Sequence, residues 1–199
     1  MENKVIDIII DFLIGWKNNN RIELRDESNK YCAIANCHYL LGQIIRNYHV
    51  EFDHYYVSES AINKWKEITD EPLFKYWYRD QVIIAKDNDV TLLEYVGNSN
   101  NYKETTLSKG DKFVFRNVFH DEHMVPIKMI LDELFALENP NYENVKKILD
   151  KIYICRMLKK EDRDLENKYN RSTDINVVIN TDYKNIKLVK LEGWNQKFN

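Results

Sequence analysis

The spacing of hydrophobic residues changes twice along this 199-residue chain, from helical to strand-like and back to helical. In the first third, apolar residues recur every three or four positions, which predicts amphipathic helices. These helices are residues 5–16, residues from Asp26 or Ser28 to Tyr48, and a segment that begins at Ser58 or Ser60 and contains Ile62, Trp65 and Ile68. The middle differs, because three short segments rich in β-branched and aromatic residues predict a three-stranded meander. They are residues 81–86, 90–96 and 112–119.

Helical spacing returns after Pro126 and is followed by elements of both kinds. We predict helices at 126–137 and 141–151, a strand at 151–158, a charged helix at 159–169, and a final hairpin from 175–180 and 186–191. Mixed segments of this kind predict an α+β fold in which a helical N-terminal third packs on a mainly antiparallel sheet. The length suits a single domain, residues 1–199, with a helical part at 1–70 and a sheet-containing part at 71–199.

The charges are numerous but balanced. Charged residues make up 31% of the chain and the net charge is −3, so no strongly basic surface indicates nucleic acid, and such binding would need a local patch. The apolar start, residues 5–16, is too short to span a bilayer and contains Asp7 and Asp11. We therefore predict a buried helix and no membrane partner.

The three cysteines are Cys32, Cys37 and Cys155, and they include no C-x-x-C pair. This pattern argues against a disulfide framework and a zinc knuckle, and it favours reduced thiols in a cytoplasmic protein. Frequent Asn, Lys, Ile and Tyr indicate an AT-rich genome, bacterial or phage. The chain has no G-x-x-x-x-G-K-[ST] and no G-x-G-x-x-G motif, which argues against nucleotide-driven chemistry of those kinds.

Four ionisable residues stand in a row at His120, Asp121, Glu122 and His123, between the last predicted strand of the meander and Pro126. Proline is favoured in the first turn of a helix, so this HDEH segment is predicted to lie at a strand-to-helix junction. Backbone N–H groups are unpaired there and the helix dipole favours anions. Imidazoles and carboxylates at such a junction can bind a divalent metal ion, and an imidazole can act as a general base toward water.

The string EHMVP, residues 122–126, resembles the D-H-x-x-P signature of HNH, or His-Me finger, nucleases. In that family an acidic residue or His binds the metal and the following His activates water against a phosphodiester. The resemblance, within residues 113–155, implies that Glu122 binds the metal and that His123 is the base. His120, in the same segment, is a further candidate metal ligand. Asn144 resembles the family's Asn that orients the base. The implied cofactor is a divalent ion (Mg, Mn or Zn), and the implied partner is DNA or RNA.

Two other interpretations remain open. Asp121 or Glu122 can instead cap the following helix, with the histidines filling space around it. The protein can also be a non-catalytic interaction module that binds another protein through an aromatic-rich face. LFKYWYRD, residues 73–80, interleaves aromatic residues with Lys75 and Arg79, and without a basic bias it favours packing or protein contact over nucleic acid.

The remaining polar groups favour structural roles. His38 lies inside an apolar helix and is predicted to be a core or boundary residue. His49 and His54, with Glu51 and Asp53, would add ligands only if their loop folded over the HDEH segment, and exposed loop positions are the simpler prediction. KKEDRD, residues 159–164, has the composition of a solvated helix face.

Overall fold

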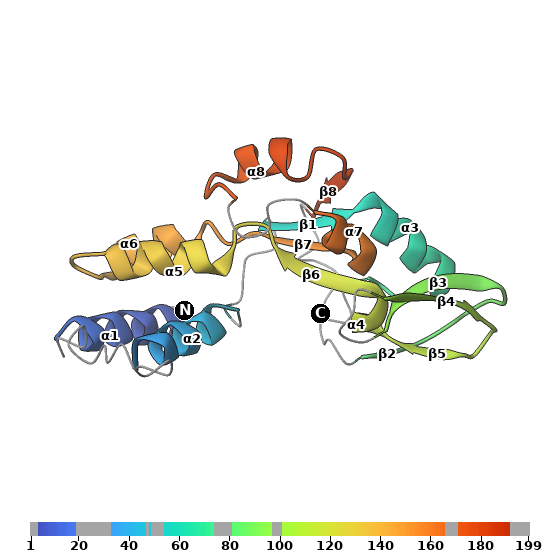
Figure 1. The fold of residues 1–199 in the computed structure, drawn as a ribbon, viewed down its shortest axis with the longest axis horizontal. Helices are drawn as coiled ribbons and strands as arrows, with labels where there is room; N and C mark the ends of the chain where they lie inside the picture. The colour runs from blue at the N-terminus through green and yellow to red at the C-terminus, as the bar shows by residue number, and fades with distance from the viewer. Residues whose placement is uncertain are drawn as a thin grey trace. The chain divides into compact units, whose positions relative to one another are not determined.

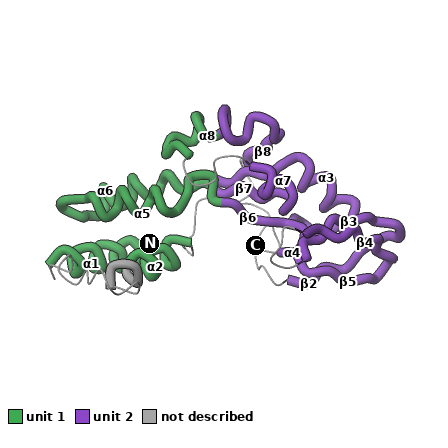
Figure 2. Tube along the Cα trace, viewed as in Figure 1, with its two compact units in different colours: residues 1–50, 123–153, 169–178 green, residues 51–122, 154–168, 179–199 purple. Residues whose placement is uncertain are grey.

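A computed structural model describes residues 4–18, 33–46, 48, 54–73, 81–96, 101–165 and 171–191. These residues form helices and strands in mixed order, which confirms the predicted α+β class (Figure 1). The chain divides into two compact units, each assembled from segments that are far apart in the sequence (Figure 2). Unit 1 contains residues 1–50, 123–153 and 169–178, and unit 2 contains residues 51–122, 154–168 and 179–199. Neither unit therefore coincides with the predicted helical part or the predicted sheet-containing part.

Unit 1 is helical. Its main helices are α1 (Lys4–Asn18), α2 (Ala33–Arg46), α5 (Ile127–Ala136) and α6 (Tyr142–Leu149). Helix α1 packs against α6, α2 against α5, and α5 against α6. The predicted first helix buries Ile6, Ile9 and Leu13, as its spacing indicates. Gly42 lies where α2 faces α5, and a Cβ atom at that position would lie 3.4 Å from Leu131.

Unit 2 is built on a four-stranded sheet with the strand order β6-β7-β1-β8. Its strands are β1 (Tyr55–Ser58), β6 (Phe119–His123), β7 (Ile154–Leu158) and β8 (Leu188–Lys190). Strand β1 runs parallel to β7 and antiparallel to β8. Two further strand pairs are antiparallel: β2 (Val82–Ile84) with β5 (Lys112–Val114), and β3 (Val90–Tyr95) with β4 (Tyr102–Leu107). Antiparallel pairing therefore predominates, as predicted.

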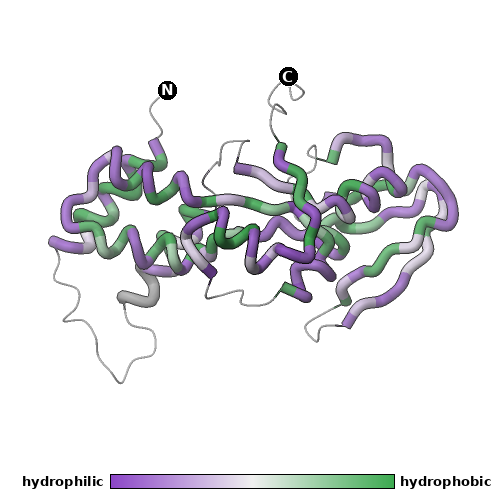
Figure 3. Tube along the Cα trace, turned by 90° about the horizontal axis from the view of Figure 1, so that it is seen from above, coloured by the Kyte–Doolittle hydropathy of each residue, from purple (hydrophilic) through white to green (hydrophobic). Residues whose placement is uncertain are grey.

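Helix α3 (Glu59–Ile68) packs on β1 and β7. Ser58 caps it, because its hydroxyl accepts the Ala61 N–H at 3.1 Å, so the first of the two predicted start positions is right. Trp65 and Ile68 are buried on one side of α3. Figure 3 shows hydrophobic and hydrophilic residues alternating along the helices and strands, as expected where each element has one buried face.

The predicted strand at 112–119 is wrong in its middle. The chain forms β5, then one helical turn, α4 (Phe115–Val118), and then β6. In a continuous strand the Phe115 and Phe119 side chains would stand roughly 13 Å apart. The helical turn instead brings their ring centroids to 5.0 Å, and both rings contact the Trp65 indole edge-to-face. Burial of these three rings together outweighs the strand propensity of the segment. The meander is also wrong, because β2 pairs with β5 and β3 pairs with the unpredicted strand β4.

The predicted final hairpin is wrong as well. Residues 175–180 lie in helix α8 (Ile175–Thr181), which begins in unit 1 and ends in unit 2. The Asp174 carboxylate accepts the Asn176 N–H at 2.9 Å and the Asp174 carbonyl accepts the Val178 N–H, so a polar start residue overrides the β-branched composition. Strand β8 pairs with β1 instead, at Val57↔Val189.

Candidate metal centre

Strand β6 carries all four residues of the HDEH segment. The segment is therefore the last part of a strand, and α5 begins just after it with Pro126 as its N-cap, so the predicted order of strand and helix is right. The strand extends this far because pairing with the neighbouring chain segment continues beyond it, where the Met124 N–H donates to the Tyr153 carbonyl at 2.8 Å. Since side chains alternate along a strand, His120 and Glu122 leave β6 on one face and Asp121 on the other.

His120 and Glu122 form the first part of the site. His120 Nε2 lies 3.3 Å from Glu122 Oε2, an ion pair when the imidazole is protonated. The imidazole side chain is 37% exposed and the carboxylate side chain is 18% exposed. Both groups are therefore partly sheltered, yet a dissolved ion can reach them.

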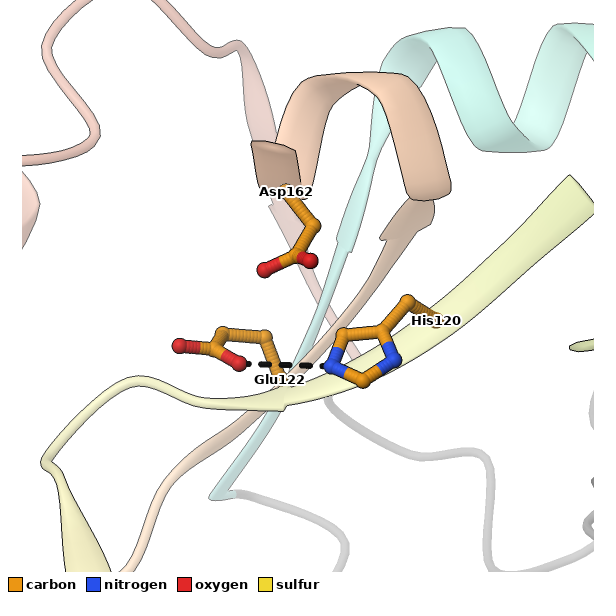
Figure 4. A group of neighbouring side chains, drawn as sticks. All are labelled: His120, Glu122 and Asp162. Atoms are coloured by element: carbon orange, nitrogen blue, oxygen red, sulfur yellow. Dashed lines mark ion pairs between the residues drawn. The ribbon is translucent and has the colours of Figure 1, made fainter. Parts of the chain in front are cut away.

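Helix α7 (Lys159–Asp164) adds a second carboxylate. The helix follows β7 directly, and the Glu161 carboxylate accepts the Leu158 N–H at 2.9 Å and the Ser58 hydroxyl at 2.6 Å. These bonds attach the first turn of α7 to the sheet. Asp162, the next residue, is buried and directs its carboxylate toward His120 and Glu122 (Figure 4).

One ligand atom from each of His120, Glu122 and Asp162 lies within 4.8 Å of the other two. Two atoms bound to the same small divalent cation at ~2.1 Å can be at most about 4.2 Å apart. The largest separation in this cluster therefore exceeds that limit by roughly 0.6 Å at most, which rotation of one carboxylate closes. The described residues thus bring together a His/Glu/Asp group that could hold a metal ion.

The donor set narrows the choice of ion. One imidazole nitrogen and two carboxylate oxygens suit Mn²⁺ or Zn²⁺, whereas Mg²⁺ prefers oxygen ligands and keeps several waters. The two carboxylates also supply two negative charges against a divalent cation. Three protein ligands leave coordination positions for water or a substrate oxygen.

Asp121, on the opposite face of β6, has a structural role. Its two oxygens accept the Arg156 Nε–H and Nη2–H at 2.7 and 2.8 Å, and the Arg156 Nη1–H donates to the Leu73 carbonyl at 2.7 Å. The guanidinium also lies 4.8 Å from the centroid of the Phe115 ring. The predicted helix cap is wrong, because α5 has Pro126 at its N-cap and no side chain caps it. Asp121 holds a buried arginine instead.

Tyr55, on β1, is buried and lies close to the ion pair between Asp121 and Arg156. Burial raises the pKa of its hydroxyl well above the usual value, the negative charge of Asp121 raises it further, and the positive charge of Arg156 opposes the shift. The phenol therefore remains neutral at physiological pH.

The two other residues implied by the HNH resemblance are not part of the His/Glu/Asp cluster. His123 ends β6, and the alternation of strand side chains turns it away from the face that holds Glu122. Asn144 lies in the first turn of α6, where its side chain accepts the Asn141 N–H at 2.9 Å and donates to the Asn139 carbonyl at 2.7 Å. Together with Asn141, it forms a capping box.

The other candidates separate into structural and undescribed groups. His38 stacks on Phe135 with ring centroids 4.2 Å apart, and Trp16 contacts both rings edge-to-face, which agrees with a packing role. His54 precedes β1. His49, Glu51, Asp53 and residues 74–80 of the aromatic segment lie outside the described residues.

Sequence reasoning missed Asp162. The KKEDRD segment was predicted to be a solvated helix face, and Lys160, Arg163 and Asp164 are indeed exposed, but Asp162 is only 5% exposed. Its place in the cluster depends on the packing of α7 beside β6, 40 residues away in sequence, and no local pattern reports that contact.

Comparison of the chain with models of known protein families, with curated proteins and with solved structures found no match. Within the described ranges, no helix has the length and apolar character needed to cross a membrane.

Proposed function

We propose that this protein binds a divalent cation through His120, Glu122 and Asp162 and uses it to hydrolyse phosphodiester bonds in DNA or RNA. The convergence of one imidazole and two carboxylates from β6 and α7 is the observation that carries the proposal. A cation bound there would stabilise the charge that develops on a phosphate and lower the pKa of water.

The protein groups have separate tasks in this proposal. Glu122 and Asp162 bind the cation and neutralise its charge, and His120 contributes the nitrogen that favours Mn²⁺ or Zn²⁺ over Mg²⁺. The HNH resemblance implies that His123 is the base that takes a proton from the attacking water, and this role rests on the resemblance alone, because His123 leaves the opposite face of β6 from Glu122. Asn144 is occupied by the helix cap, so support for an orienting role comes from the resemblance alone.

Metal binding is tested first, by isothermal titration calorimetry and thermal melts with Mn²⁺, Zn²⁺ and Mg²⁺. A ligand that binds only the folded state and is present at 100 times its Kd stabilises by about 2.7 kcal/mol. For a chain of this length that corresponds to a rise in Tm of roughly 5–10 °C. Glu122→Gln and Asp162→Asn should remove this shift, because an amide supplies no negative charge.

Asp164→Asn is the matched control. Asp164 lies on the same helix, but its side chain is 60% exposed and pairs with Lys160, so the variant should keep the shift of the wild type. A wild-type protein that shows no binding of any divalent ion would refute the proposal.

Cleavage is tested second, on labelled single- and double-stranded DNA and on RNA, with the ion that binds best. Glu122→Gln and Asp162→Asn should be inactive. His123→Ala should bind the ion normally and lose ~100-fold or more in rate if it is the base. Cation binding without any cleavage would refute the hydrolytic part of the proposal and favour the interaction module.

A further inference from the structure

The outer side of helix α7 holds a cluster of cationic and aromatic side chains that the metal centre does not use. This α7 patch consists of Tyr95 on β3, Tyr102 on β4, and Lys159, Lys160 and Arg163 on α7. All five belong to unit 2, as do the residues of the metal centre. The two tyrosines are neighbours across the β3–β4 ladder, with ring centroids 5.8 Å apart.

The cations of the α7 patch are held over these rings. Lys159 Nζ lies 4.3 Å from the centroid of the Tyr95 ring, and Arg163 Cζ lies 4.9 Å from the same centroid. The Arg163 Nη2–H also donates to the Tyr95 hydroxyl oxygen at 3.1 Å. Such contacts limit the rotamers of long side chains, so less conformational entropy is lost when the side chains bind an anion.

Strand β4 is also hydrogen-bonded directly to α7. The Tyr102 hydroxyl donates to the Lys159 carbonyl at 3.1 Å. Partial burial raises the pKa of this hydroxyl, so it stays protonated and able to donate. Lys160 Nζ lies farther from the Tyr102 ring, at 5.9 Å, and pairs with Asp164.

Helix geometry places the α7 patch beside the metal centre. Lys159 and Asp162 are three residues apart on α7, so their Cβ atoms are neighbours at roughly 5–6 Å. The same helical turn therefore directs a carboxylate toward His120 and Glu122 and carries Lys159, whose ammonium group lies over the Tyr95 ring and donates to the Arg116 carbonyl at 3.0 Å. The metal centre and the α7 patch are thus attached to one short helix.

We infer that the α7 patch binds the backbone and bases of single-stranded nucleic acid and delivers it to the metal centre. The inference rests on the function proposed above. Lysine and arginine recognise phosphates, and tyrosine rings that remain half-exposed offer a surface for stacking. Bases are free to stack on side chains in a single strand, whereas a duplex keeps them paired, so the tyrosines favour the single strand. Of the three carboxylates on α7, Glu161 accepts bonds from Ser58 and Leu158 and Asp162 faces the metal centre, so Asp164 is the one that lies among the three cations of the patch.

The test measures binding without the metal chemistry, by fluorescence anisotropy of a labelled 20-nucleotide single strand in EDTA at low salt. Three phosphate contacts should make log K fall against log salt with a slope of about −2 for a single strand. Lys160→Gln and Arg163→Gln should each weaken binding and reduce the slope by about 0.7. Lys146→Gln is the matched control, because Lys146 forms the same i,i+4 ion pair, with Asp150, on α6. It should bind like the wild type.

The tyrosine contribution needs its own pair of variants. Tyr102→Leu should weaken binding roughly fivefold or more through lost stacking, whereas Tyr102→Phe keeps the ring and should bind like the wild type. Circular dichroism melts of both variants check that the protein is folded. Absence of single-strand binding by the wild type, equal loss in Lys146→Gln, or tighter binding of a duplex would each overturn the inference. Because EDTA removes the cation, these outcomes are independent of the metal titration that tests the proposed function.

Discussion

Replacement of Asp121 by Ala should destabilise the protein far more than loss of a surface carboxylate. The Arg156 side chain is 2% exposed, and Asp121 accepts two of its N–H groups and forms an ion pair with it. Removing one partner of a buried pair typically costs roughly 3–5 kcal/mol, because the other charge stays buried and uncompensated. The Asp121 side chain is 32% exposed, so water can enter its place and hydrate part of the guanidinium. We therefore expect a loss of roughly 2–4 kcal/mol.

Urea unfolding, followed by tryptophan fluorescence and far-UV circular dichroism, measures this loss. Asp132→Ala is the control, because Asp132 lies on the surface of α5, 3.7 Å from Lys128, and an exposed pair of this kind contributes less than ~1 kcal/mol. The double variant Asp121→Leu/Arg156→Met should recover part of the loss, since it buries no charge. A loss of about 1 kcal/mol for Asp121→Ala would refute the reasoning, since that is the size of a helix-cap effect.

Three further predictions concern Asn144, Tyr55 and the cysteines. Asn144→Ala should lower the free energy of unfolding by about 1 kcal/mol through loss of the α6 capping box, and an unchanged thermal melt would contradict this. Tyr55 has a folded-state pKa above its unfolded value of 10.0, so its contribution to stability is complete below that pH and falls as the pH rises toward the folded pKa. Tyr55→Phe should therefore lose less stability than the wild type above pH 10 in urea titrations, and parallel curves would argue against it. Non-reducing mass spectrometry should find no intramolecular disulfide, and buried Cys155 should react with a thiol reagent only after unfolding.

Elements with long, regular patterns were predictable from the sequence. The apolar residues of helix α1 follow a helical period over four turns, and α6 has a polar cap at Asn141 before its apolar positions. The local sequence is therefore enough to predict both helices. Strand β7 was predicted within three residues of its bounds. In each case the local preference and the tertiary contacts agree.

The predictions from sequence were wrong where contacts with distant residues determine the structure. Residues 115–118 became a helical turn because Trp65, some 50 positions earlier, offers a surface that covers Phe115 and Phe119 together. Strand β8 pairs with β1, more than 120 positions earlier, a pairing for which the sequence gives no local signal. The candidate site shows the same division: His120 and Glu122 were predictable as neighbours, whereas Asp162 enters through packing of α7.

The row of four ionisable residues has a simple explanation in the alternation of a strand. Adjacent positions on β6 face opposite sides, so His120 and Glu122 reach toward α7 while Asp121, between them, reaches Arg156 on β7. The ion pair therefore joins β6 to its neighbouring strand at the residue that separates the two ligands. Because β7 leads directly into α7, the segment that anchors Arg156 also positions Asp162. The Asp121–Arg156 ion pair thus helps to fix β6 beside β7, and through β7 and α7 it helps to position the three residues that we propose bind the cation.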